Sequence, residues 1–193
     1  MFIIGGHYRR QQLVAPKGNQ TRPTSNALRE TLFNICQSSI AGARFLDIFA
    51  GSGAVGLEAL SRGATSATFI ESDREAIRCI EKNIIHLGVT PSTSLLKGDV
   101  RSLLARLEKQ QTFFDLIYAD PPYGVCLPGS AKRYSLYIVE WIDAHQLLVP
   151  GGSLFVEEDA RQGLSPERLQ TLQLNTSRRM GGSSLSEYRS LLA

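Results

Sequence analysis

The chain has 193 residues, of which 42% are hydrophobic and 20% charged, and this composition fits one globular domain with a substantial core while excluding disordered and fibrous proteins. Its three cysteines are widely spaced and form no CxxC pair, which favours a reducing compartment over a disulfide framework or a zinc site. No apolar stretch resembles a signal peptide or a membrane span, so we expect a cytoplasmic protein without a membrane partner. The three histidines lack ligands at metal-binding spacing, and we expect no metal.

The charge is unevenly distributed along the chain. The whole sequence carries a net charge of +3, but residues 1–46 hold six basic residues against Glu30 alone, which gives this segment +5. The remaining 15 basic and 17 acidic residues leave −2 on the rest of the chain. A positive N-terminal segment is typical of an arm that contacts phosphates, although a solvated face that keeps a protein soluble has the same composition.

The N-terminal segment predicts a small extension ahead of the main domain. Residues 1–15 alternate around a glycine pair and predict a β-hairpin, and the following "PKGNQTRP" is typical of a loop. A helix with a threonine N-cap and an apolar face is predicted next, over residues 24–38. We therefore assign residues 1–22 to a basic hairpin extension and residues 23–193 to the principal domain.

From residue 44 onward, short apolar runs alternate with helical patterns. The runs are rich in β-branched and aromatic residues and read "RFLDIF", "SATFIE", "TSLLK", "FFDLIYA" and "GSLFVEE". The helices predicted between them cover residues 54–62, 74–87, 100–109 and 135–148. This alternation predicts right-handed crossovers and a parallel sheet covered on both faces, which is an α/β fold. Two last strands, joined through Gly181 and Gly182, predict a C-terminal antiparallel hairpin.

The first predicted strand ends in "LDIFAGSGAVGLEAL", and open parallel sheets bind ligands at the carboxyl ends of their strands. Gly51 and Gly53 allow a tight turn and close approach of the backbone, and the helix that begins near Ala54 offers unpaired N–H groups. The letters match the GxGxxG nucleotide-binding pattern, and Glu71 ends the next strand, where a ribose-binding acid belongs. Small residues at this place also serve simply to let a helix pack closely on a strand.

Two further acids separate the possible ligands. Asp47 lies inside the end of the first strand, where a carboxylate would repel a pyrophosphate but attract a cationic amino-acid ligand. Asp99 closes the third strand, where it can accept from an adenine amine while Val100 packs on the ring; either acid alone also suits an ordinary strand end or helix cap. Three acids at three successive strand ends favour S-adenosylmethionine, which carries an ammonium and a sulfonium and no phosphate, over NAD.

The fourth predicted strand stops at "DPPYG", because two prolines cannot donate the hydrogen bonds of a sheet. The Asp120 carboxylate and a carbonyl of Pro121 and Pro122 can accept hydrogen bonds from the exocyclic amine of a nucleobase and direct its lone pair toward a methyl donor. Tyr123 adds a flat face on which an extruded base can stack. The alternative is a strand-terminating turn with a buried tyrosine.

This stretch resembles the [DN]-P-P-[YF] motif of amino-methyltransferases that act on exocyclic amines of adenine, cytosine or guanine. Residues 22–34, "RPTSNALRETLFN", and residues 46–64, "LDIFAGSGAVGLEALSRGA", further resemble the RsmD-type family, bacterial methyltransferases of the 2-amino group of a guanine in 16S ribosomal RNA. The resemblance covers nearly the whole chain. It implies a Rossmann-like class I methyltransferase fold with a seven-stranded, mostly parallel sheet. It also implies S-adenosylmethionine as the donor and the small ribosomal subunit, at an advanced stage of assembly, as the substrate.

The resemblance assigns roles to individual residues. Its cofactor positions match Asp47, Gly51, Ser52, Gly53, Glu71 and Asp99, beside Val100 from the strand-end pattern. Its catalytic motif matches Asp120, Pro121, Pro122 and Tyr123, where many relatives carry phenylalanine in place of the tyrosine.

The expected substrate-binding residues fall into three groups. Arg9 and Arg10 belong to the basic hairpin. Lys132 and Arg133 lie in the polar loop after the motif, which either gates the substrate or is a solvated connection. The resemblance adds contributors to a cofactor lid or an RNA surface, namely Arg22, Thr24 and Arg29.

Three other functions remain open at this point. A DNA amino-methyltransferase would share the motif, but we expect it to need a further target-recognition domain. An NAD-dependent oxidoreductase would share the glycine pattern but is opposed by Asp47 and by the DPPY motif. A non-catalytic RNA-binding assembly factor would have no use for that motif. We therefore expect an RNA N-methyltransferase that acts as a monomer on 16S ribosomal RNA.

Overall fold

The computed structural model describes residues 1–16, 26–166 and 168–192. The chain forms two compact units, residues 1–106 and residues 107–193. None of the helices in the described ranges is long and apolar enough to cross a membrane.

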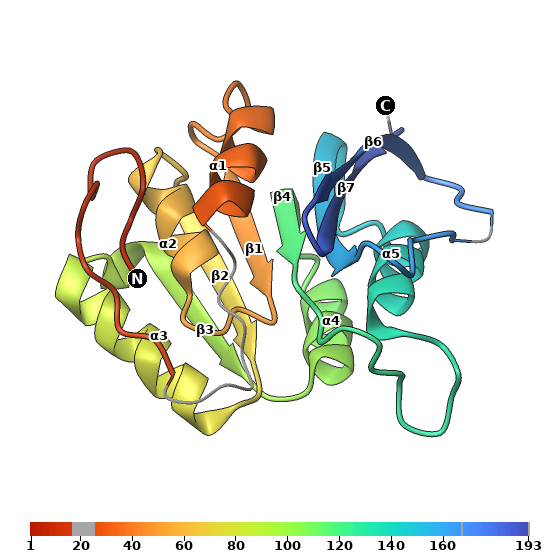
Figure 1. Ribbon diagram of the computed structural model, residues 1–193, viewed down its shortest axis with the longest axis horizontal. Helices are drawn as coiled ribbons and strands as arrows, with labels where there is room; N and C mark the ends of the chain where they lie inside the picture. The colour runs from red at the N-terminus through yellow and green to blue at the C-terminus, as the bar shows by residue number, and fades with distance from the viewer. Residues whose placement is uncertain (17–25, 167, 193) are drawn as a thin grey trace. The chain divides into compact units, whose positions relative to one another are not determined.

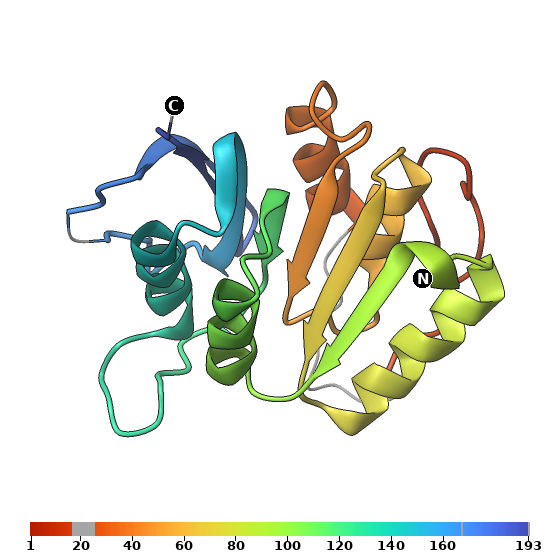
Figure 2. The ribbon, with the colours of Figure 1, turned by 180° about the vertical axis from the view of Figure 1, so that it is seen from behind.

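Three parallel strands form the centre of the first unit. They are β1 (Arg44–Ile48), β2 (Ser66–Glu71) and β3 (Thr93–Lys97), and they lie side by side in the order β3, β2, β1 (Figures 1 and 2). The register pairs Asp47 of β1 with Phe69 of β2. Every residue of β1 after its first is buried, as expected of a parallel strand with both faces covered.

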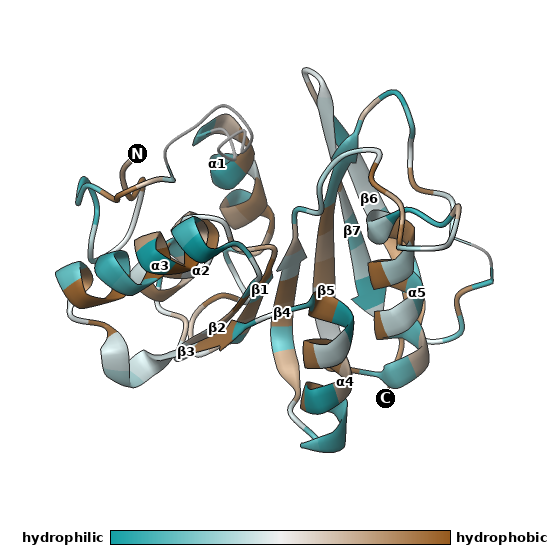
Figure 3. Cartoon of the chain, turned by 90° about the horizontal axis from the view of Figure 1, so that it is seen from below, coloured by the Kyte–Doolittle hydropathy of each residue, from teal (hydrophilic) through white to brown (hydrophobic). Residues whose placement is uncertain are grey.

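Four helices follow or precede these strands. They are α1 (Asn26–Ile35), α2 (Ala54–Ser61), α3 (Arg74–Leu87) and α4 (Val100–Lys109), of which α2 packs on β1 and β2. A short 3-10 turn, η1 (Thr90–Ser92), separates α3 from β3. Figure 3 shows that α3 carries hydrophobic and hydrophilic stripes, the pattern of a helix with one buried face.

Helix α3 has the termini that its sequence predicts. The Asp73 carboxylate accepts hydrogen bonds from the backbone N–H groups of Glu75 and Ala76, at 3.0 and 2.8 Å, which caps the first turn. Gly88 ends the helix in the left-handed conformation, with φ of 67°, which a residue with a side chain rarely adopts.

The predicted N-terminal hairpin is present in reduced form. Phe2 and Gln12 form an isolated antiparallel bridge, and Leu13 donates a backbone hydrogen bond of 2.8 Å to Met1. Residues 1–16, hereafter the N-terminal arm, lie on α2 and α3 rather than apart from the unit. The predicted boundary at residue 22 lies outside the described residues and stays a prediction.

One buried carboxylate joins the N-terminal arm, α1 and α2. Glu58 is 0% exposed, and it accepts backbone hydrogen bonds of 2.8 Å from both Ile4 and Gly5. Arg62 donates to the same carboxylate at 2.9 Å, and Arg29 forms a buried ion pair with it at 3.5 Å. Because an ionised group without donors is very costly in a core, these contacts fix the place of the arm on α2.

The second unit holds a parallel strand pair and an antiparallel hairpin. Its elements are β4 (Phe114–Ala119), α5 (Tyr134–His145), β5 (Leu148–Asp159), β6 (Leu172–Met180) and β7 (Ser183–Ser190). Strand β5 pairs with β4 in parallel and with β7 in antiparallel, and β6 pairs with β7. The strand order is β3-β2-β1-β4-β5-β7-β6, the seven-stranded, mostly parallel sheet with a C-terminal hairpin that the sequence predicts.

The predicted helix over residues 135–148 extends too far. Helix α5 ends at His145, and Gln146 caps it with φ of 51°. Leu148 already belongs to β5, where it pairs with Phe114. The apolar leucine at this position continues the helical pattern in the sequence but is buried because it begins a strand.

Replacing Glu58 by glutamine is expected to lower the free energy of unfolding by about 3–5 kcal/mol, because it removes the anion from a fully buried ion pair with Arg29. The matched control is Glu81→Gln on α3, whose ion pair with Lys97 is about half exposed and is expected to contribute less than about 1 kcal/mol. Urea unfolding of both variants measures the difference. Equal losses in the two variants would contradict the role given to Glu58.

Candidate cofactor site and catalytic motif

The turn between β1 and α2 has the backbone that its glycines predict. Gly51 and Gly53 adopt φ of 56° and 77°, the left-handed region that favours glycine. Gly56 serves packing, because a Cβ atom there would lie 2.4 Å from the ring of Phe69. A Cβ on Gly51 would meet no atom within 4 Å, so the turn leaves open space beside its backbone.

Asp47 lies beneath this turn and is 1% exposed. Its Oδ2 accepts a hydrogen bond of 2.9 Å from the backbone N–H of Gly56, in the first turn of α2. Burial raises the pKa of the carboxyl from 3.8 to about 7, with a further increase from the charge of Glu71, and the Gly56 hydrogen bond opposes this increase. Asp47 is therefore a buried acid whose ionised form would be favoured by a nearby cation.

Glu71 is brought to the same turn from the end of β2. Its Oε2 accepts from the N–H of Gly51 at 2.7 Å, and its Oε1 accepts from Ser72 and Asp73 at 2.7 and 2.9 Å. A carboxylate offers about four acceptor positions, so one remains beside these three bonds. The side chain is partly exposed.

Asp99 adjoins the end of β2, because the N–H of Gly98 donates to the carbonyl of Glu71 at 2.9 Å. The Asp99 carboxylate accepts from the N–H groups of Arg101 and Ser102 in the first turn of α4, the geometry of an N-cap. Burial raises its pKa, but the Arg101 side chain and these N–H groups outweigh burial and hold the pKa below its usual value. Asp99 therefore acts as a helix cap, which is the alternative named in the sequence analysis. Its contact with an adenine amine stays a prediction, and so does the packing of the buried Val100 on the adenine ring.

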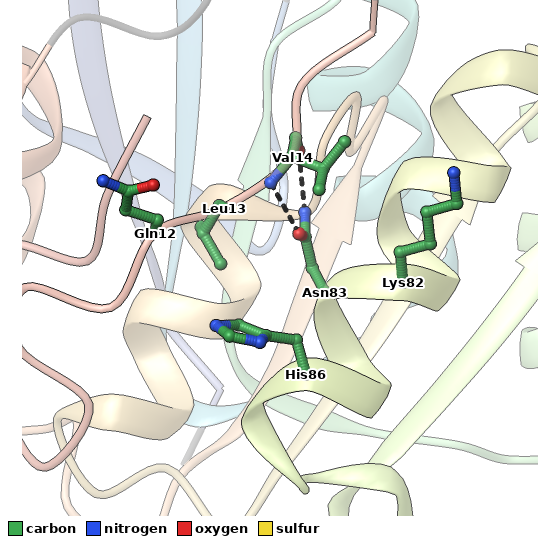
Figure 4. A pocket seen from close by; sticks show the side chains of 6 residues that line it. All are labelled: Gln12, Leu13, Val14, Lys82, Asn83 and His86. Atoms are coloured by element: carbon green, nitrogen blue, oxygen red, sulfur yellow. Dashed lines mark hydrogen bonds between the residues drawn. The ribbon is translucent and has the colours of Figure 1, made fainter.

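An asparagine that the sequence analysis missed ties the N-terminal arm to the glycine turn. Asn83 of α3 is 0% exposed, and its side-chain amide exchanges two hydrogen bonds with the backbone of Val14, at 2.8 and 2.9 Å (Figure 4). The same amide donates to the carbonyl of Ser52 at 2.9 Å. The available signal was a polar residue on the apolar face of a helix. Figure 4 also shows the pocket around Asn83, which contains none of the predicted cofactor residues and is lined by Gln12, Leu13, Val14, Lys82, Asn83 and His86.

The DPPY motif begins directly after β4, in the second unit. Asp120 is partly exposed, Pro121 is buried and Pro122 is exposed. Tyr123 is partly exposed, and its hydroxyl hydrogen-bonds to Glu157 and, at 2.8 Å, to Ser183. The strand therefore ends where the prolines predict, and the acid and the aromatic residue of the motif are both partly exposed.

The predicted substrate-binding residues of the first unit have different environments. Arg9 and Arg10 are exposed on the N-terminal arm. Arg29 is 0% exposed and bonds to Glu58 and to the carbonyl of Phe2, so it lies in the core and not on an RNA surface, while its predicted contribution to a cofactor lid stays a prediction. Two further predicted residues, Arg22 and Thr24, lie outside the described residues.

The loop after the motif is held by contacts within the second unit. Arg133 pairs with Glu158 at 3.0 Å and donates to the carbonyl of Gly163 at 2.9 Å. Lys132 pairs with Glu140 at 2.5 Å. Substrate binding by these two residues stays a prediction. In the part of the chain that the structure describes, no group of three or more His, Cys, Asp or Glu residues could hold a metal ion.

Asp47 should make stability depend on pH. The unfolded carboxyl ionises near 3.8 and the folded one near 7, so its contribution is complete below about pH 4 and is lost as the pH rises to about 7. The difference in unfolding free energy between wild type and Asp47→Asn is expected to fall by about 1.4 kcal/mol per pH unit in this window, on the order of 4 kcal/mol in all. Urea titrations from pH 4.5 to 8 measure it, and parallel curves for the two proteins would contradict the assignment.

Comparison with known proteins identifies the family. The family model described as conserved hypothetical protein 95 matches residues 1–189. A putative ribosomal RNA methyltransferase of Bacillus subtilis is 32% identical over 190 residues, which cover 98% of this chain and 98% of that protein. Ribosomal RNA small subunit methyltransferase D of Escherichia coli is 41% identical over 121 residues, 63% of this chain and 59% of that protein.

A solved structure agrees with these relatives. That of a putative methyltransferase from Escherichia coli matches with a TM-score of 0.83 and 32% identity, and the match covers 98% of this chain and 97% of the other. The fold is thus that of a methyltransferase, with the strand order given above. The chain therefore belongs to the conserved hypothetical protein 95 family, the RsmD-type methyltransferases whose motifs it carries.

Proposed function

We propose that this chain transfers a methyl group from S-adenosylmethionine to the exocyclic 2-amino group of a guanine in 16S ribosomal RNA, acting as a monomer in the cytoplasm on the small ribosomal subunit. Family membership makes the chain an S-adenosylmethionine-dependent methyltransferase, and the proposal adds the RNA and the target atom. The observation that carries the proposal is the DPPY motif, which directly follows a buried strand and in which Asp120 and Tyr123 are both partly exposed.

The residues of the first unit suit a cationic nucleoside donor. The turn at Gly51 leaves open space beside its backbone, and Glu71 retains an acceptor position that fits a ribose hydroxyl. The buried Asp47 carboxyl would be ionised more readily beside an ammonium group. We assign the donor to these residues together with Ser52, Gly53, Asp99 and Val100. The bound donor would supply a methyl group on a sulfonium, a good electrophile for an amine.

The DPPY motif supplies acceptors for the amine. In the proposed mechanism, Asp120 and a carbonyl of Pro121 or Pro122 accept the two N–H groups of the 2-amino nitrogen. These bonds orient the nitrogen and favour the positive charge that develops on it during attack. The ring of Tyr123 stacks on the face of the extruded guanine, as enzymes that act on unstacked bases require. Stacking of this kind does not depend on the identity of the base. No covalent bond to the enzyme is needed.

A methyl-transfer assay with three acceptors tests the choice of nucleic acid. S-adenosylmethionine with a labelled methyl group is offered in parallel to unmethylated small ribosomal subunits, to free 16S ribosomal RNA and to DNA. Label is expected in the RNA of the subunits. Incorporation into DNA alone would replace the proposal with a DNA amino-methyltransferase, and tight binding of NAD without S-adenosylmethionine would remove the donor assignment.

Asp120→Ala is expected to reduce turnover with small subunits by a factor that corresponds to about 2–4 kcal/mol of transition-state stabilisation. Its affinity for S-adenosylmethionine, measured by calorimetry, is expected to stay within about twofold of wild type, because the proposed contact of the carboxylate is with the base and not with the donor. The control is Glu108→Ala, an acid of α4 that contacts His145 with both side chains about two-fifths exposed. Loss of donor binding with normal single-turnover chemistry at saturation would contradict this role of Asp120.

A further inference from the structure

The hydroxyl of Tyr123 donates a hydrogen bond to a buried carboxylate of β5. Glu157 is 5% exposed, and its Oε1 accepts the hydrogen bond of Tyr123. Its Oε2 accepts a second phenolic hydrogen bond of 2.8 Å, from Tyr118 at the end of β4. Ser183 of β7 contacts the Tyr123 hydroxyl at 2.8 Å. Since that hydroxyl has one proton, which goes to Glu157, the Ser183 hydroxyl is the donor of the last bond.

The sheet register places these groups on one face. Tyr118 pairs with Phe155 in the β4–β5 ladder, and Glu157 follows two residues later on the same face of β5. Asp159 pairs with Ser183 in the β5–β7 ladder, so Ser183 shares that face as well. Three neighbouring strands, which are visible beside one another in Figure 1, therefore converge on the hydroxyl of a residue that lies in the loop beyond them.

The hydroxyl of Tyr123 is a permanent donor. Burial and the hydrogen bond to Glu157 raise the pKa of Tyr123 far above its usual value, so the phenol keeps its proton at any ordinary pH. Tyr123 as a whole is partly exposed, and the hydrogen bonds of its hydroxyl hold the far end of its ring.

We propose that Glu157 is a positioning residue, which holds the ring of Tyr123 through its hydroxyl in the orientation that stacks on the target base. The inference rests on the proposed function, because it assumes that the ring of Tyr123 stacks on a target base. In this arrangement the hydroxyl contacts the protein, and the ring and Asp120 are left to contact the base.

A second buried carboxylate in the same unit provides a matched comparison. Glu187 of β7 is 2% exposed, and it accepts hydrogen bonds from Ser153, Asn175 and Arg189 at 3.2, 2.7 and 3.0 Å. Among the described residues, Glu187 makes no hydrogen bond to the DPPY motif. Its burial resembles that of Glu157, and it accepts from three side chains where Glu157 accepts from two, but it lacks the link to Tyr123.

The first test compares Glu157→Gln with wild type and Glu187→Gln. Glutamine keeps the shape of the side chain but replaces one acceptor oxygen with a donor, so one phenolic hydrogen bond is lost. We expect kcat with small ribosomal subunits to fall at least tenfold in Glu157→Gln and less than twofold in Glu187→Gln. Affinity for S-adenosylmethionine should stay within twofold in both. Equal losses of kcat in the two variants, or none in Glu157→Gln, would overturn the proposal.

A double-mutant cycle separates positioning from a general structural effect. Tyr123→Phe keeps the ring and removes the hydroxyl through which Glu157 acts. Glu157→Gln is therefore expected to lower kcat less than threefold in the Tyr123→Phe background, against at least tenfold in the Tyr123 background. The bond from Tyr118 is present in both backgrounds, so a purely structural role would give the same loss twice and refute the inference.

Two further measurements keep the proposal testable under other outcomes. If Glu157→Gln does not fold, Ser183→Ala removes the other partner of the Tyr123 hydroxyl, and its loss of kcat should again disappear in the Tyr123→Phe background. If wild type methylates no RNA, the proposed function fails, and amide hydrogen exchange of residues 119–127 decides the contact alone. Exchange should rise in Glu157→Gln and not in Glu187→Gln, and equal exchange would show that Glu157 does not hold the motif.

Discussion

A carboxylate that leaves water must be given hydrogen-bond donors, and this requirement determines which segments of the chain pack together. In the first unit, Glu58 gathers two backbone N–H groups and two arginines, and so fixes the N-terminal arm and α1 on α2. In the second unit, Glu157 gathers two tyrosines, one of which belongs to the DPPY motif. The buried acids thus connect segments that are distant in the sequence. Neither apolar burial nor helix propensity specifies these connections.

The need of carboxylates for hydrogen-bond donors also shapes the candidate cofactor site. Asp47, Glu71 and Asp99 each accept from backbone N–H groups at the start of a helix or turn, so the ends of three strands are shaped by their own acids. Glu71 holds the Gly51 turn in place, while the buried Asp47 keeps a raised pKa that a cationic ligand would lower. The site combines a fixed backbone with negative charge, a pairing suited to S-adenosylmethionine and unsuited to a pyrophosphate.

Local pattern was sufficient for most of the fold, and long-range pairing explains what it missed. Alternating runs and glycine turns predicted the sheet and α3 because period and caps are encoded within a few residues. The resemblance assigns Arg29 to a cofactor lid or an RNA surface, and its buried contact with Glu58, 29 positions away, is not visible in a local pattern. Asn83 and Glu157 were missed for the same reason: their contacts depend on how strands and helices pack. The end of α5 was wrong because Leu148 fits both a helix and a strand.

Transfer of a methyl group to the 2-amino nitrogen of a guanine is tested most directly by the identity of the labelled nucleoside. Small subunits are methylated by the wild-type chain with labelled S-adenosylmethionine, and their RNA is digested to nucleosides. The nucleosides are separated and identified by mass spectrometry against synthetic standards. The predicted result is a single labelled species, N2-methylguanosine, that maps to one position of 16S ribosomal RNA. Label in a methylated adenosine or cytidine, or in guanosine methylated at another atom, would contradict the proposed chemistry.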